Sequence, residues 1–267
     1  MENIKEYTLR KKEEMRIEIL NLEKKPKLVI FQVNDDPASN AYIKGKINDL
    51  NTIGALYEHI VLPKDISQED LIKEVEKKNI DPTVTGIIVQ MPLPPQICEE
   101  DIKKVVTPAK DVDGFNVLST FRAATPNGIM TFLGDQGYDF KGKNAVVIGR
   151  SNIVGRPIAK YLLDASANVT VLHSKTKNED MRRYLEHADL VVVAVGKKEF
   201  IDNSYKFKDA AVVFDVGINR NEEGKLKGDV VEDLKVAYKS PVPGGVGLLT
   251  RLSLLCNLME AYKQQNK

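Results

Sequence analysis

Continuous apolar runs in the second half of the chain predict buried strands. Residues 145–148, 189–196 and 211–217 are rich in valine, lack the alternation of a half-exposed strand, and end in or next to a glycine. Such runs are typical of parallel strands that are covered on both faces. Helical spacing over about 157–165 follows the first run and precedes a further strand at 168–174. This alternation predicts a parallel α/β sheet.

A second alternation of strands and helices comes before it. The predicted strands lie at 27–33, 56–62 and 86–90, and the predicted helices at 4–25, about 39–53 and 67–78. Ser39 or Asn40 is the expected N-cap of the second helix, and Gly54 is its expected end. Ser67 is the expected N-cap of the third helix, with Asp70 in the position of a capping box. The first half therefore predicts another parallel sheet.

These patterns predict an α/β protein of two domains, with the boundary between Phe115 and Thr125. We expect the first domain at 1–118 and the second at 119–248, entered through a helix over about 126–134. A last helix occupies part of 249–267. Its apolar positions follow helical spacing and are expected to bury one face: Leu252, Leu255, Leu258, Met259 and Tyr262.

Composition narrows the function classes. The formal net charge of the 267 residues is +1, so no overall field favours nucleic acid or an anionic membrane. Cys98 and Cys256 are too few and too far apart for a disulfide framework or a metal cluster, and we expect no metal site. The charged start lacks an apolar leader, and no stretch reaches the length of a membrane span. A reducing cytoplasm is the expected location.

The turn after residue 148 is a candidate phosphate site. Gly149 ends a predicted strand and Gly155 stands where a helix can begin, with Ser151 in the middle position of an imperfect G-x-G-x-x-G pattern. A helix N-terminus offers free N–H groups and a positive dipole end to a phosphate, as in Rossmann-type domains. Many strand-to-helix turns carry two glycines and bind nothing, so this pattern alone leaves both interpretations open.

The end of the next strand favours NADP over NAD. A carboxylate there would accept from the 2′-hydroxyl of NAD, but this chain has His173, Ser174 and Lys175, with Arg150 in the glycine turn. A guanidinium, a hydroxyl and an ammonium suit a phosphate dianion. The alternative is that both cations are ordinary solvated surface residues.

Candidate catalytic residues lie in the first half. Tyr42 and Lys46 are four residues apart and share a helix face. Gln90 closes an apolar strand before a proline-rich turn, and Asp111 and Asp113 lie in a loop, Lys110-Asp-Val-Asp-Gly. Each has an ordinary alternative, since a Tyr/Lys pair is usually packing and Asp-x-Asp-Gly is usually a turn. The residue types alone do not reveal a reaction.

Nine motifs in order carry a resemblance to a known family. They are Tyr42-x-x-x-Lys46, GIIVQMPLP at 86–94, KDVDGF at 110–115, TPxG at 125–128, GRSNIVG at 149–155, HSKT at 173–176, DVGINR at 215–220, GDV at 228–230 and PVPGGVG at 241–247. With them the chain resembles the bifunctional methylenetetrahydrofolate dehydrogenase/methenyltetrahydrofolate cyclohydrolase family over nearly its whole length.

The resemblance implies two successive reactions. NADP⁺ accepts hydride from 5,10-methylenetetrahydrofolate, and water then opens the methenyl ring to 10-formyltetrahydrofolate. It also implies that the last helix packs on the first domain and that the protein is a homodimer.

The resemblance also implies the site residues. Lys46 is the key polar catalyst, Gln90 hydrogen-bonds it, Tyr42 packs on the folate and Asp113 anchors the pterin. Further contacts to substrate are implied for Gly244 and Gly245. The residues implied to touch the cofactor are Gly149, Arg150, Ser151, Ser174 and Ile218.

The chain departs from the family pattern at Ala124, at Leu248 and in a short 115–124 segment, while Lys46, Gln90 and Asp113 remain. Two other functions stay open from sequence. One is a different NADP-dependent two-domain oxidoreductase, and the other is a non-catalytic NADP-binding regulator.

Overall fold

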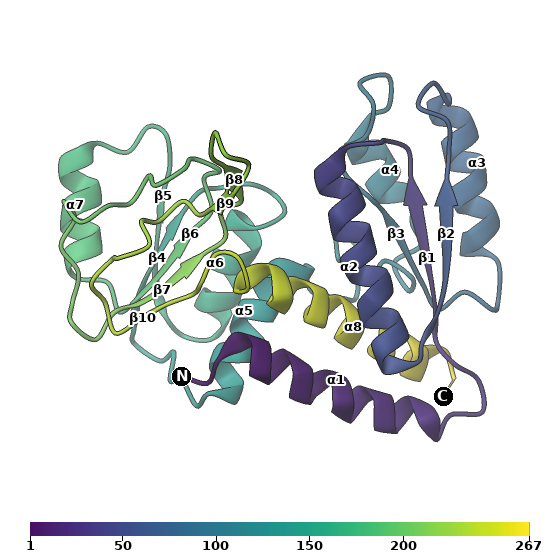
Figure 1. Cartoon of the computed structure of the whole chain (residues 1–267), viewed down its shortest axis with the longest axis horizontal. Coiled ribbons are helices and arrows are strands. Elements are labelled where there is room, and N and C mark those ends of the chain that lie inside the picture. Colours follow the sequence, from purple (N-terminus) through teal and green to yellow (C-terminus); the bar gives the residue numbers. More distant parts are fainter. Residues whose placement is uncertain (267) are drawn as a thin grey trace. The chain divides into compact units, whose positions relative to one another are not determined.

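The computed structural model describes residues 1–266, with only the backbone of Ala38, and it divides the chain into two compact units (Figure 1). The first unit contains Leu9–Ala124 and the chain from Arg251 onward, and the second contains Met1–Thr8 and Thr125–Thr250. Two helices, α1 (Ile4–Leu20) and α8 (Val246–Gln265), each contribute residues to both units. Lys267, the end of the predicted last helix, lies outside the described residues.

The first unit is built on a three-stranded parallel sheet in the order β2-β1-β3, which confirms the predicted class of sheet. Its strands are β1 (Lys27–Gln32), β2 (Leu56–Val61) and β3 (Gly86–Val89), and its helices are α2 (Pro37–Ile53), α3 (Gln68–Asn79) and α4 (Glu99–Val105). The sequence analysis missed α4, which is short and strongly charged.

The central strand β1 places alternate residues in two different cores. Leu28 and Ile30 belong to a core shared with α2 and α8, whereas Val29 and Phe31 belong to a core shared with α3 and α4. This follows from the period of two along a strand. The sheet is therefore covered on both faces at β1 and β3, which is why these two strands are nearly continuous apolar runs, whereas β2 at the edge is largely exposed.

The predicted cap of α2 was wrong. Asp36 is the N-cap, and its carboxylate accepts from the backbone N–H of Ser39 at 2.7 Å. Pro37 occupies the first helical position, where its missing N–H costs nothing, so the helix begins earlier than predicted. At the other end Gly54 takes φ +77°, as a left-handed C-cap requires. Ser67 caps α3 as predicted, accepting from the N–H of Asp70 at 3.1 Å.

The second unit is built on a five-stranded parallel sheet in the order β10-β7-β6-β4-β5. Its strands are β4 (Asn144–Ile148), β5 (Asn168–Leu172), β6 (Leu190–Val193), β7 (Val212–Asp215) and β10 (Tyr238–Lys239), with an antiparallel pair β8 (Asn219–Arg220) and β9 (Leu226–Lys227) beside them. Its helices are α5 (Ala124–Asp135), α6 (Gly155–Asp164) and α7 (Asn178–Glu186). The sequence analysis had not predicted α7.

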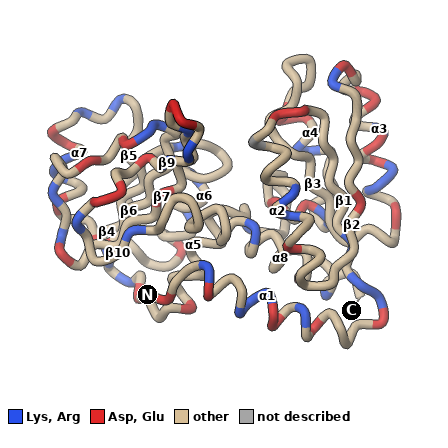
Figure 2. The backbone as a smooth tube through the Cα atoms, viewed as in Figure 1, with Lys and Arg blue, Asp and Glu red and all other residues tan. Residues whose placement is uncertain are grey.

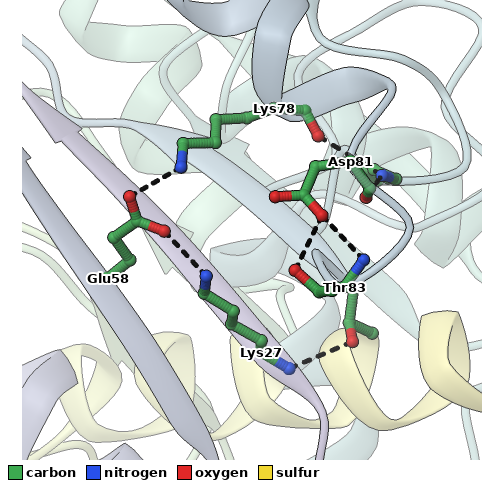
Figure 3. Close-up of polar contacts among 7 residues, drawn as sticks. Lys27, Glu58, Lys78, Asp81 and Thr83 are labelled. Atoms are coloured by element: carbon green, nitrogen blue, oxygen red, sulfur yellow. Dashed lines mark hydrogen bonds and ion pairs between the residues drawn. The ribbon is translucent and has the colours of Figure 1, made fainter.

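An ion-pair network lies near the amino ends of β1 and β2 (Figure 3). Glu58 accepts from Lys27 at 2.7 Å and from Lys78 at 2.6 Å, and these hydrogen bonds lower the pKa of the Glu58 carboxyl. Asp81 stabilises the turn before β3 by accepting from the N–H of Thr83. The network ties α3 to the sheet at the end opposite to the carboxyl ends of the strands.

The surface carries both charge signs. Figure 2 shows positive and negative residues interspersed along α1 and α3, and many form pairs three or four residues apart, such as Arg16 with Glu13. Among the helices within residues 1–266, none is long and apolar enough to cross a bilayer. Over the same residues no group of His, Cys, Asp and Glu side chains forms a candidate metal cage.

Candidate active site

Lys46 is the centre of a polar cluster at the carboxyl end of the first sheet. It lies on α2, is 5% exposed, and its Nζ donates to Oε1 of Gln90 at 3.2 Å. Gln90 directly follows β3 and is oriented by its own bond to the carbonyl of Met91 at 2.8 Å. One turn before Lys46, the ring centroid of Tyr42 lies 5.6 Å from the same Nζ. Three candidates from two distant parts of the sequence, α2 and the end of β3, therefore meet in space.

Burial favours the neutral amine of Lys46 over its ammonium form. Loss of hydration lowers the pKa of the Lys46 ammonium, and the negative charge of Asp113 opposes this to a smaller extent. Asp113 reaches the cluster because the preceding segment runs beside β3, where the N–H of Ile87 donates to the carbonyl of Lys110 at 2.8 Å. The site thus combines an amine of lowered basicity with a nearby carboxylate.

The two aspartates of the Asp-x-Asp-Gly loop are in different environments. Asp111 is 4% exposed and accepts from the N–H of Asn116 at 2.8 Å. Burial, supplemented by the charge of Asp113, raises the pKa of Asp111 to about 6. Asp111 therefore organises the turn, and Asp113 is the carboxylate near Lys46. The sequence pattern did not distinguish them.

In the second unit, the glycines after β4 are required by close packing. Gly149 has φ +119°, and a side chain on it would overlap the carbonyl of Ala194 at the end of β6. A Cβ on Gly155 would lie 2.6 Å from the carbonyl carbon of Gly149. The hydroxyl of Ser151 accepts from the N–H groups of Val154 and Gly155 at 3.2 and 3.3 Å, so it caps the start of α6.

A hollow of about 380 Å³ opens beside this turn, at the carboxyl ends of β4, β5 and β6. Its lining includes Gly149, Arg150 and Ser174, together with Lys197. Its apolar lining residues are Ile148, Met181, Ala194, Val195 and Phe200. An apolar hollow with two cations and a close backbone approach at glycine fits a phosphorylated nucleotide at this edge of an α/β sheet.

Two predicted cofactor residues, Ser151 and Ile218, do not line that hollow, and neither do the predicted substrate residues Gly244 and Gly245. Ser151 lies at the start of α6, as described above. Ile218 follows β7 and is 57% exposed. Gly244, with φ +93°, and Gly245 lie in the turn before α8, where a side chain on Gly245 would overlap the carbonyl of Pro241.

Sequence reasoning missed a buried carboxylate that holds one wall of the hollow. Asp229 is fully buried and accepts from the backbone N–H groups of Val195, Gly196 and Lys197 at 2.7, 2.9 and 2.8 Å. These residues form the loop after β6. The sequence signal for Asp229 was the Gly228-Asp-Val motif. The structure shows why this motif needs its glycine, since a side chain on Gly228 would overlap the neighbouring carboxylate of Asp215.

Comparison with known proteins finds two domain matches, both from one family. Residues 3–113 match the tetrahydrofolate dehydrogenase/cyclohydrolase catalytic domain, and residues 123–266 match the NAD(P)-binding domain of the same name. The chain therefore belongs to the tetrahydrofolate dehydrogenase/cyclohydrolase family, as the sequence motifs predicted. It is 43% identical to the bifunctional protein FolD of Oceanobacillus iheyensis, over 99% of this chain and 97% of the relative.

Solved structures show the same fold. The bifunctional FolD enzyme, methylenetetrahydrofolate dehydrogenase/cyclohydrolase, of Campylobacter jejuni is 38% identical, with a TM-score of 0.94 and 98% of each chain covered. The FolD of Trypanosoma brucei, solved in complex with NADP cofactor and an inhibitor, is 28% identical, with a TM-score of 0.94 over 100% of this chain and 98% of that one.

Proposed function

We propose that this protein oxidises 5,10-methylenetetrahydrofolate with NADP⁺ and hydrolyses the resulting 5,10-methenyltetrahydrofolate to 10-formyltetrahydrofolate. The family supplies the reaction class, and the buried contact between Lys46 and Gln90 is the observation that carries the chemistry. The relative from Oceanobacillus iheyensis, a bifunctional protein FolD, is 43% identical over 99% of this chain.

In the hydrolytic step, the task of Lys46 is proton transfer. A water molecule adds to the methenyl carbon and loses a proton, and a ring nitrogen must gain one as its bond to that carbon breaks. An amine whose pKa is lowered by burial can accept and relay this proton near neutral pH. Gln90 orients the amine without adding charge.

Binding of the folate falls to the neighbouring groups. Tyr42 offers a ring face for the pterin, and Asp113 offers a carboxylate that accepts from two N–H donors on the pterin edge. Gly244 and Gly245 let the backbone approach the substrate in our assignment, because neither carries a side chain.

The nucleotide contacts belong to the turn after β4 and its surroundings. We assign the 2′-phosphate to Arg150 and Ser174, since both line the hollow and no carboxylate stands at the end of β5. We assign further cofactor contacts to Gly149 and Ser151 in the turn after β4. Ile218, which follows β7, offers an apolar side chain to the cofactor. When bound, NADP⁺ supplies the hydride acceptor.

The remaining assignments follow the family. We propose a folate domain at 1–118 completed by the helix at 249–267, an NADP domain at 119–248, a homodimer, and a cytoplasmic location. The role assigned to Lys46 does not depend on the exact domain bounds, on the homodimer or on the location.

Two assays test the function on one purified protein. NADP⁺ reduction with 5,10-methylenetetrahydrofolate measures the dehydrogenase, and decay of methenyl absorbance measures the cyclohydrolase. Lys46→Met should lower hydrolysis by roughly 10²–10⁴, the range of general acid–base catalysis, and leave NADP⁺ affinity unchanged. Lys44→Met removes an exposed ammonium from the same helix and should change neither activity.

Two outcomes would contradict the proposal. Unaltered protein that reduces NADP⁺ with another small substrate, and not with the folate, would exclude the assigned reaction. Near-normal hydrolysis by Lys46→Met would remove this residue from the mechanism.

A further inference from the structure

A buried amide ends the central strand of the first sheet. Gln32 is the last residue of β1 and is only 5% exposed, and the four residues before it are buried and apolar. The mechanism above does not use this side chain. A buried amide is costly unless its polar atoms are paired, so its contacts indicate what it does.

The amide of Gln32 is held from three directions. Its Nε2 donates to the carbonyl of Asn34 at 2.7 Å and to Oδ1 of Asn40 at 2.6 Å. Its Oε1 lies 2.8 Å from Nε2 of His59, and this ring nitrogen carries the hydrogen because the amide oxygen can only accept. The side chain is therefore fixed in one orientation by β2, by the loop after β1 and by the first turn of α2.

Asn34 continues these contacts toward the third strand. Its Nδ2 donates to the carbonyl of Pro92 at 2.6 Å. The residue before Pro92 is Met91, whose carbonyl accepts from Nε2 of Gln90 at 2.8 Å. The segment that orients Gln90 is thus itself bound to the loop that Gln32 fixes.

These contacts form one network along the carboxyl edge of the sheet. It follows the strand order β2-β1-β3 (Figure 1) and belongs to the first unit alone. Its members, in order, are His59, Gln32, Asn34, the 91–92 segment, Gln90 and Lys46. The hydroxyl of Ser39 also donates to the carbonyl of Met91, at 3.3 Å, so the segment has a second and longer attachment.

We propose that Gln32 is a positioning residue, which holds Gln90 against Lys46 through Asn34 and the 91–92 segment. This inference rests on the proposed function. The contact from Nζ of Lys46 to Oε1 of Gln90 is 3.2 Å, at the long end of the hydrogen-bond range, so a small shift of the segment would break it. Stability alone is a poor explanation, because apolar groups of the same shape can replace a buried hydrogen bond at almost no cost.

Replacement of Gln32 by methionine keeps much of the side-chain length and removes the amide. The side chains of His59 and Asn40 are exposed, so water can replace their lost partner. Gln265→Met is the matched control. The amide of Gln265 also joins two segments of the same unit, through the carbonyls of Thr85 at 2.9 Å and Ala109 at 3.1 Å, but it does so at the amino end of β3.

The expected effect falls on the hydrolytic step. Gln32→Met should lower kcat for methenyltetrahydrofolate hydrolysis by about tenfold, because small misplacements of catalytic groups cost up to about 10²-fold. The effect should fall on kcat rather than on KM, because the network ends at the catalytic pair. NADP⁺ affinity should be unchanged, because the nucleotide hollow lies in the other unit. Gln265→Met should change none of these quantities.

A double-variant cycle separates positioning from an independent loss. Gln90→Met removes the end of the network and should itself lower kcat by about tenfold or more. If Gln32 acts through Gln90, the double variant Gln32→Met, Gln90→Met should be no slower than Gln90→Met alone, within about twofold. Two independent effects would instead multiply, because residues that do not interact contribute additively in free energy.

Multiplied losses in the double variant would overturn the positioning role, and so would normal kcat in either single variant. If Gln32→Met does not fold, Asn34→Ala in the half-buried loop breaks the next contact and must show the same cycle with Gln90→Met. Unaltered protein that does not hydrolyse methenyltetrahydrofolate refutes the proposed function itself. Active unaltered protein with multiplying losses refutes only the role of Gln32, so the two failures are distinguishable.

Discussion

Replacement of Gly155 by alanine sets helix propensity against packing. Gly155 is the first residue of α6, and alanine in a helix is favoured over glycine by up to about 1 kcal/mol. The added Cβ, however, would lie 2.6 Å from the carbonyl carbon of Gly149 and 2.8 Å from the Cα of Arg150. These are backbone atoms, which cannot rotate away as a side chain can.

The required movement can be worked from these distances. The nearest atom to the added Cβ is the carbonyl oxygen of Gly149, and ordinary contact begins at 3.4 Å, so α6 must move by about 1 Å from the glycine turn. Overpacking of this kind costs typically about 1–3 kcal/mol, which exceeds the gain from propensity. We expect the free energy of unfolding to fall by about 1–2 kcal/mol. We also expect the Kd for NADP⁺ to rise by about tenfold or more, because the turn and the helix start move apart.

A matched substitution isolates the packing effect. Gly134 lies in the last turn of α5 in the same unit, is exposed, and has no atom within 4 Å of an added Cβ. Gly134→Ala should therefore raise stability by about 0.4–1 kcal/mol and leave NADP⁺ binding unchanged. Urea denaturation and NADP⁺ titration of both variants give the comparison. If Gly155→Ala stabilised the protein as Gly134→Ala does, with normal NADP⁺ affinity, the packing argument would be refuted.

Three further outcomes are expected. Arg150→Ala should remove most of a preference for NADP⁺ over NAD⁺ that we expect to be at least about tenfold in kcat/KM, about 1.4 kcal/mol, and equal use of both by unaltered protein would contradict this. Asp229→Asn should cost about 2 kcal/mol of stability in urea and weaken NADP⁺ binding, since an amide cannot accept at both former carboxylate oxygens; an unchanged midpoint would oppose it. Because the pKa of Asp111 is raised from 3.8 to about 6, the folded state holds its proton more tightly, so this contribution to stability is full below about pH 4 and lost as pH rises through 6. Between about pH 4 and pH 7 the unaltered protein should therefore lose about 2–3 kcal/mol of unfolding free energy that Asp111→Asn does not lose. Urea denaturation at both pH values checks this, and equal losses for the two proteins would exclude the effect.

The class of fold could be predicted because it depends on local patterns. Valine-rich runs such as 190–193 occur in strands buried on both faces, and both sheets are parallel as predicted. The wrong N-cap of α2 and the missed helix α7 arose where two neighbouring residues could both act as the cap, or where the apolar periodicity was weak. Asp36 and Ser39 are both good N-caps, and Pro37 decides for the earlier one by taking the first helical position. In α7 only Met181 and Leu185 are buried, so its charged sequence gave little apolar periodicity.

The candidate site could be predicted only in its local parts. The pair of Tyr42 and Lys46 follows from helical spacing, and Gly149 and Gly155 follow from a strand that feeds a helix. The contact of Lys46 with Gln90 spans 44 positions and depends on the parallel pairing of β1 with β3. No spacing rule contains that information.

The sequence by itself determined the family, the two parallel sheets and the candidate residues, because helix faces, strand ends and glycine turns are encoded within a few neighbouring positions. Only the tertiary structure decided what those residues experience. Burial lowers the pKa of Lys46, and it separates Asp111 from Asp113 although they are two positions apart. The contact of Asp49 with Arg251 likewise exists only in the folded chain. Desolvation and ion pairing depend on which distant segments exclude water from a group, and that is a property of the packed molecule.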